Sequence, residues 1–150
     1  MVRTLKLSYE ECLKQGLLRK IPKSRQKAEE SIKTSQRWLS EAKINLTSGS
    51  YNSCLLSSYL AMFHAARSIL WNDGFREKSH ACIGRYLETV YVKKKLLEQR
   101  WVDLLDYYRN IRHDDSYSTS FEATAVECEN ALKISVEFVS CMEALLKKGR

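Results

Sequence analysis

The residues that make turns are scarce in this chain. It contains one Pro and five Gly among 150 residues. All-β and loop-rich folds depend on many more such residues, so their scarcity favours long helices. The length suffices for one domain with a single buried core. A content of 44% hydrophobic and 29% charged residues is ordinary for a soluble globular protein.

Disulfide and metal-binding patterns are also missing. The five Cys, at positions 12, 54, 82, 128 and 141, form no CxxC pair, and an odd number at wide spacing argues against a disulfide framework. We expect these thiols to pack as small apolar residues in a reducing compartment. The three His, at positions 64, 80 and 113, do not have zinc-ligand spacing, and we expect neither a metal nor a cofactor.

Long apolar runs are absent as well. No stretch approaches the length of a membrane span, and the N-terminus lacks the apolar run of a signal peptide. We therefore expect a soluble, cytoplasmic protein with no membrane partner.

Positive charge is present in excess, and it is unevenly distributed. Residues 1–100 carry 19 Lys and Arg against 9 Asp and Glu, whereas residues 101–150 carry 6 against 9. A polyanion such as RNA suits this asymmetry, because basic side chains release condensed counterions when they meet phosphates. A role in solubility alone would also explain it.

Capping residues and helix breakers divide the chain into helices. Ser8 and Glu11 form the pattern of a capping box for a short N-terminal helix, which we expect to end at Pro22. Thr119 and Glu122 predict a second capping box at the start of the last helix. The predicted helices after the first cover residues 24–46, 51–71, 79–92, 96–114 and 119 to the C-terminus.

These segments predict an all-α fold. We expect an antiparallel up-and-down helical bundle of four to five main helices plus the short N-terminal helix. The chain is predicted to be a single domain over residues 1–150, with an N-terminal extension at 1–22 and the bundle at 24–146.

The helix predicted over 51–71 has two packing faces. One face carries large apolar residues, and the opposite face carries small residues with a single ionic side chain, Arg67. Gly74 follows and can end the helix in the left-handed conformation. We expect this helix at the centre of the bundle, where it can also form part of a dimer interface. His64, on its small-residue side, is predicted to be a hydrogen-bonded packing residue.

The stretch "LLDYYRNIRHDDSY", residues 104–117, crowds polar groups onto one helix end. Asp106, Arg109 and His113 share one side of that helix beside an apolar stripe, with Asn110 at its edge and Arg112 on the other flank. His can act as general acid or base on a 2′-hydroxyl or a leaving oxygen, and Arg can hold a phosphate and stabilise developing charge. Cleavage of RNA would need no metal here.

A solvated surface network is the alternative for the same residues. Charged side chains three or four positions apart commonly pair on helix surfaces, and a His in a final turn complements the helix dipole. Spacing alone leaves both interpretations open.

Further basic and aromatic residues extend the candidate surface. Lys93, Lys94 and Lys95 form the densest basic run, which suits either an RNA backbone contact or a solvated loop. Tyr107 and Tyr117 are placed to stack on bases, whereas Tyr108 is predicted to be core. His80, just after a predicted cap, is expected to be neutral, because the helix dipole disfavours its protonated form.

Three segments together resemble a known family. They are the helix "YLAMFHAAR", the "KSH" that opens the next helix, and the arginine-rich end leading to "SY". Over residues 24–146 the chain is similar to the HEPN superfamily, and more narrowly to small stand-alone HEPN proteins encoded beside minimal nucleotidyltransferases.

The resemblance implies more than the residues do alone. It implies a helical bundle that forms a homodimer, in which two copies of an Arg–polar–His motif face one cleft. It implies a metal-independent endoribonuclease that acts as a toxin and is silenced by a nucleotidyltransferase antitoxin. Other members of the family look inactive. The resemblance therefore also implies an alternative, a non-catalytic subunit that binds a nucleotide or substrate for a nucleotidyltransferase.

The motif departs from the family pattern in its spacing. In the nuclease form, four to six residues lie between the Arg and the His, whereas three residues lie between Arg109 and His113 here. A second register aligns Arg112 and His113 with an "R-H-x-A-D-Y" pattern, in which Ser116 replaces the Asp. We predict catalytic roles for three residues and RNA or nucleotide binding for six. These are Arg109, Asn110 and His113 for catalysis, and Asp106, Arg112, Tyr117, Lys93, Lys94 and Lys95 for binding.

Overall fold

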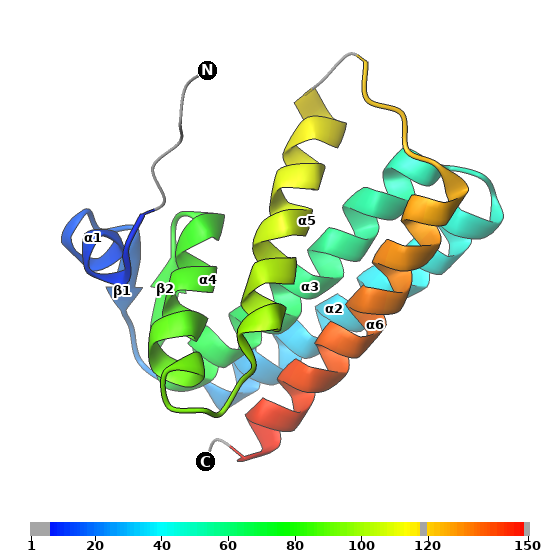
Figure 1. Ribbon diagram of the computed structural model, residues 1–150. Coiled ribbons are helices and arrows are strands. Elements are labelled where there is room, and N and C mark those ends of the chain that lie inside the picture. The colour runs from blue at the N-terminus through cyan, green and yellow to red at the C-terminus, as the bar shows by residue number, and fades with distance from the viewer. Residues whose placement is uncertain (1–6, 118–119, 149–150) are drawn as a thin grey trace.

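The computed structural model describes residues 7–117 and 120–148, without the side chains of 114–117. This part of the chain is mostly helical, as the sequence predicts (Figure 1). Its elements are α1 (Tyr9–Lys14), β1 (Leu18–Lys20), α2 (Arg25–Thr47), α3 (Tyr51–Asp73), β2 (Phe75–Glu77), α4 (His80–Leu87), the π-helical turn η1 (Glu88–Val92), α5 (Gln99–Tyr117) and α6 (Ala125–Lys148).

Helix α3 lies at the centre of the bundle. It packs against α2, α5, α6 and α4, and most of its residues are buried. Figure 1 shows α2, α3, α5 and α6 as the long helices of the bundle, with α4 beside α5 and with α1 and the two strands on the other side of α4. The large-residue face and the small-residue face that the sequence predicts for this helix therefore both pack against other helices.

Local capping chemistry sets several helix ends where the sequence predicts them. Ser8 and Glu11 form the reciprocal capping box of α1, and the Ser24 hydroxyl accepts from Lys27 N at 3.1 Å at the start of α2. Gly74 ends α3 with φ +86°. Helix α1 stops at Lys14, well before Pro22, because the chain turns there into β1.

The start of α6 differs from the sequence prediction. Thr119 lies outside the described residues, and Glu122 precedes the helix. The box that forms is five residues later, where Thr124 N donates to Glu127 Oε1 at 2.9 Å and Glu127 N donates to Thr124 Oγ1 at 3.2 Å. Asn52 of α3 bonds the backbone of the preceding segment at two points, which holds that segment out of the helix.

Two short strands are a feature that the sequence analysis missed. β1 and β2 pair antiparallel, with Leu18 opposite Glu77 and Lys20 opposite Phe75. Three residues are too few to show an alternating pattern in the sequence. The pairing ties the N-terminal segment to the chain that leaves α3.

A disulfide corrects the expectation that all five thiols are reduced. Cys12 of α1 is bonded to Cys82 of α4, with 5.9 Å between their Cα atoms and 70 residues between them in sequence. Such a distance in sequence gives no spacing pattern, so only the packing of α1 on α4 reveals it. Cys54 and Cys128 are buried thiols, as expected of small apolar residues.

Among the residues that the structure describes, no helix combines the length and apolarity that crossing a bilayer requires.

Candidate functional site

The second half of α5 brings two arginines against α3 and α4. Arg112 Nη2 lies 3.3 Å from Nδ1 of His80, the first residue of α4. Its guanidinium carbon also lies 5.5 Å from the ring centroid of Tyr59 on α3. Arg109 is one turn earlier on the same helix. Three helices therefore supply side chains to one site, which we call the arginine cluster: Tyr59, His80, Asp106, Arg109 and Arg112.

The environment of His80 fixes its protonation. Phe63 stacks on the imidazole at 4.0 Å, and Tyr59 Oη lies 2.9 Å from Nδ1. Burial, with the nearby Arg112 charge second, lowers the pKa of His80 to about 4. A guanidinium has no lone pair to offer, so Nδ1 must accept from Arg112 and the imidazole proton resides on Nε2. His80 is thus neutral at pH 7, mainly because it is buried.

Tyr59 keeps its proton as well. Burial raises the pKa of this phenol to about 12, against the lowering effect of the Arg112 and Arg109 charges. The side chain is almost fully buried. Tyr59 therefore serves as a neutral hydrogen-bonding partner within the cluster.

Asp106 links the cluster to a buried arginine. Its carboxylate accepts from Arg85 Nη2 at 2.6 Å, and Arg109 Nη2 lies 3.6 Å from its other oxygen. The Arg85 side chain is 4% exposed. A Cβ at Gly84 would lie 3.0 Å from Asp106 Oδ1, so a larger residue there would require the carboxylate to shift by a few tenths of an ångström.

The two arginines of the cluster, Arg109 and Arg112, have unsatisfied donors. The Nε atoms of Arg109 and Arg112 are buried and make no hydrogen bond. Buried polar groups of this kind are rare, and an anionic oxygen beside the two guanidiniums would supply acceptors. The arrangement is suited to holding a phosphate.

The other predicted residues lie at different places around this cluster. His113 and Asn110 are exposed on the same helix end. The Tyr117 side chain lies outside the described residues. Tyr107 is 55% exposed, whereas Tyr108 is core, as predicted.

The lysine run lies away from the arginine cluster. Lys93, Lys94 and Lys95 are exposed in the turn between η1 and α5. They precede the first residue of α5, while the arginines occupy its second half. The structure does not bring the two groups together.

Sequence reasoning missed two residues and one contact at this site. Tyr59 lies among the large buried residues of α3 and was not singled out. Arg85 was not singled out either, although a lone Arg within a short apolar helix is an unusual feature. The contact between His80 and Arg112 could not be found from spacing, because 32 residues separate them.

Comparison with known proteins places the chain in a family. A family model described as HEPN domain matches residues 28–145. The chain belongs to the HEPN family. The matched region contains every residue of the arginine cluster. The HEPN chain is also similar to a protein of Methanocaldococcus jannaschii named "Putative toxin MJ0605", with 24% identity over 124 residues, which cover 83% of this chain and 92% of that protein.

Metal ligands are not grouped in the described part of this HEPN protein. No three His, Cys, Asp or Glu side chains among those residues come together in a way that could hold a metal ion.

Proposed function

We propose that this HEPN protein binds RNA at the arginine cluster and cleaves it as a metal-independent endoribonuclease. The observation that carries the proposal is the pair of guanidiniums one turn apart on α5, each with a buried Nε that lacks an acceptor. A phosphodiester offers oxygens of the required charge and geometry.

Binding of the phosphate would use the Nε atoms of both arginines, each together with a terminal nitrogen of the same guanidinium. Arg109 is 29% exposed, so solvent and ligand can reach it, while Asp106 limits its motion. Arg112 is held between Tyr59 and His80. Ordering of these side chains before the ligand arrives reduces the entropy lost on binding.

Proton transfer would fall to His113. An exposed imidazole at the end of α5 can take the proton of a 2′-hydroxyl or give one to the leaving oxygen, while a guanidinium stabilises the charge of the transition state. Asn110 would orient the substrate. His80 would position Arg112, because its Nδ1 accepts from that arginine and its pKa of about 4 leaves it neutral at pH 7.

The toxin role and the partners are part of the same proposal. The name of the M. jannaschii protein supports a toxin, and a nucleotidyltransferase antitoxin would silence it. We propose a homodimer in which the arginine clusters of two copies face one cleft.

A non-catalytic role is the second candidate. The histidine in contact with Arg112 is held neutral, which favours phosphate binding over proton transfer at that contact. The protein would then bind a nucleotide or substrate for a partner nucleotidyltransferase.

The deciding assay incubates the full chain with single-stranded RNA in EDTA. We expect the wild type to cut, His113→Ala to stop cutting with binding retained, and Arg112→Ala to weaken binding. Lys43→Ala, which changes an exposed lysine of α2, is the matched control and should behave as wild type.

Two outcomes would contradict the nuclease proposal. Cleavage by His113→Ala at the wild-type rate would remove His113 from the mechanism. Binding by the wild type without any cleavage would favour the non-catalytic role.

A further inference from the structure

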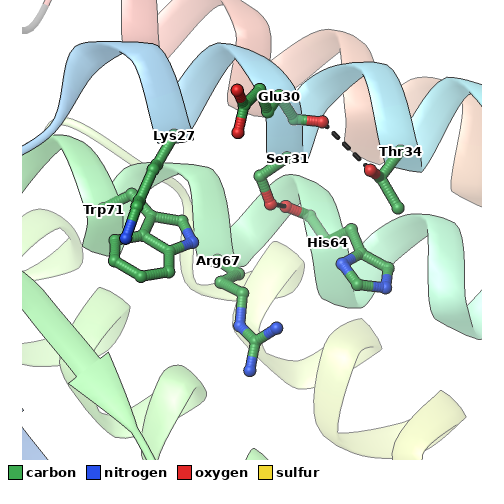
Figure 2. Close-up of a pocket in the computed structure, with 7 residues that line it drawn as sticks. All are labelled: Lys27, Glu30, Ser31, Thr34, His64, Arg67 and Trp71. Carbon is green, nitrogen blue, oxygen red and sulfur yellow. Dashed lines mark hydrogen bonds between the residues drawn. The ribbon is translucent and has the colours of Figure 1, made fainter.

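A pocket of about 300 Å³ opens between α2 and α3. Figure 2 shows His64, Arg67 and Trp71 projecting from one face of α3, with Lys27 and Ser31 facing them from α2. The Ser31 hydroxyl donates to the His64 carbonyl oxygen at 2.7 Å, which ties the two helices together beside the pocket.

Trp71 gives the pocket an aromatic wall. Its side chain is only partly buried, and Lys27 Nζ lies 4.6 Å from the ring centroid. The ammonium is on a flexible stem, so it can move aside from the ring while staying near the pocket. An indole that is partly exposed in a cavity is a platform on which a planar ring can stack.

Arg67 supplies a fixed positive charge. Its Nε and Nη2 donate to the two carboxylate oxygens of Glu77 at 2.8 and 2.7 Å. Glu77 is 3% exposed, whereas Arg67 is 28% exposed, so the carboxylate anchors the guanidinium from the buried side. The remaining N–H groups need little ordering to meet an anion.

His64 completes the pocket with a neutral hydrogen-bonding group. Burial, with the Arg67 charge second, lowers the pKa of this imidazole. A neutral imidazole offers one donor and one acceptor. The edge of a nucleobase presents both kinds of group.

A series of side-chain contacts links the pocket to the arginine cluster. The Arg67 guanidinium carbon lies 4.9 Å from the centroid of the Phe63 ring, and Phe63 stacks on His80. His80 in turn contacts Arg112. An RNA strand that binds at the arginine cluster therefore has a neighbouring pocket for one of its nucleotides.

We propose that this pocket is a subsite for one unpaired nucleotide, with its base against Trp71 and its phosphate beside Arg67 and Lys27. Its volume of about 300 Å³ is at the small end of ligand pockets, which suits a single nucleotide. As a subsite for RNA it rests on the proposed function. A free nucleoside monophosphate offers the same chemistry.

The test measures dissociation constants for the full chain with two probes. One is a short single-stranded RNA made uncleavable by 2′-O-methyl groups, and the other is AMP. Trp71→Ala should weaken binding of the RNA by about 5- to 150-fold, the range expected for the loss of one base stack. Trp71→Phe keeps an aromatic ring and should recover most of the affinity. Circular dichroism and thermal unfolding would check that each variant is folded.

Two further comparisons separate stacking from charge. A second set of RNAs carries a single abasic nucleotide, placed at a different position in each RNA. For the RNA whose abasic nucleotide occupies the pocket, Trp71→Ala should bind as tightly as the wild type, because no base is present to stack on Trp71. Lys27→Ala should weaken binding several-fold, whereas Lys43→Ala on the same helix should not change it.

The outcomes distinguish this proposal from the proposed function. If Arg112→Ala weakens RNA binding but folded Trp71→Ala leaves both RNA and AMP binding unchanged, the subsite is refuted and the RNA function stands. If AMP binds in a Trp71-dependent manner and RNA does not bind, the pocket takes a free nucleotide and the RNA function is refuted. If neither probe binds the wild type, both proposals are overturned.

Discussion

Replacement of Asp106 by Asn should destabilise the protein more than it weakens RNA binding. The carboxylate meets Arg85 at 2.6 Å, and Arg85 is 4% exposed, while Asp106 itself is 16% exposed. Its pair with Arg109 is longer, at 3.6 Å, and Arg109 is 29% exposed. The two arginines therefore depend on Asp106 to different extents.

The magnitude follows from burial. Removing one partner of a buried ion pair costs about 3–5 kcal/mol, because a charge is left uncompensated. Glu88 remains 3.6 Å from Arg85, so we expect Asp106→Asn to cost about 3 kcal/mol, at the lower end. At this chain length that corresponds to a fall in Tm of roughly 6–12 °C. The longer, partly exposed pair with Arg109 should contribute less than about 1 kcal/mol.

Thermal and urea unfolding would measure the effect. Asp103→Asn is the matched control, because Asp103 is exposed on the same helix and should change the free energy of unfolding by no more than about 0.5 kcal/mol. The double variant Arg85→Met with Asp106→Leu should be more stable than either single charge-removing variant, since no buried charge is left alone.

Equal stability of Asp106→Asn and Asp103→Asn would refute this reasoning. A large loss of RNA affinity in Asp106→Asn with unchanged stability would indicate that Asp106 takes part directly in RNA binding.

Three other predictions concern the fold. Cys12→Ser removes a disulfide that closes a loop of 70 residues and should lower the free energy of unfolding by about 4 kcal/mol; identical urea midpoints for variant and wild type without reductant would contradict the pairing. Gly74→Ala should destabilise more than Gly49→Ala, since both have positive φ but only the first places a Cβ 2.8 Å from a backbone oxygen, and equal Tm values would argue against that clash. The pKa of His80 is about 4 in the folded chain and 6.5 in the unfolded chain, so the unfolded chain binds the proton more readily. The free energy of unfolding should therefore fall as pH falls from 6.5 towards 4. If the free energy of unfolding of His80→Gln depended on pH as steeply as that of the wild type, this explanation would be contradicted.

Much of the helical layout is determined by the sequence alone. The starts of α1 and α2 and the end of α3 depend on Ser8, Ser24 and Gly74, whose capping bonds or backbone conformations act within a few residues. The large-residue and small-residue faces of residues 51–71 likewise indicate a central helix, because neither face carries the many charges of a solvent-exposed surface. Even so, the sequence contains two capping-box patterns before α6, Thr119–Glu122 and Thr124–Glu127. The second one caps the helix, and a hydrogen bond from Ala123 N to Asn52 of α3, far away in sequence, favours it.

The tertiary structure alone decided the composition of the site. The sequence predicts that Arg109 and Arg112 lie near each other, because they are three residues apart on one helix. The sequence predicted a neutral His80, whereas the contact of Arg112 with His80 and Tyr59 requires three helices to pack. The pKa of His80 depends mainly on burial, and burial does not exist until those helices meet. Contacts within one helical turn are set by chain geometry, while contacts between helices depend on the whole packed core.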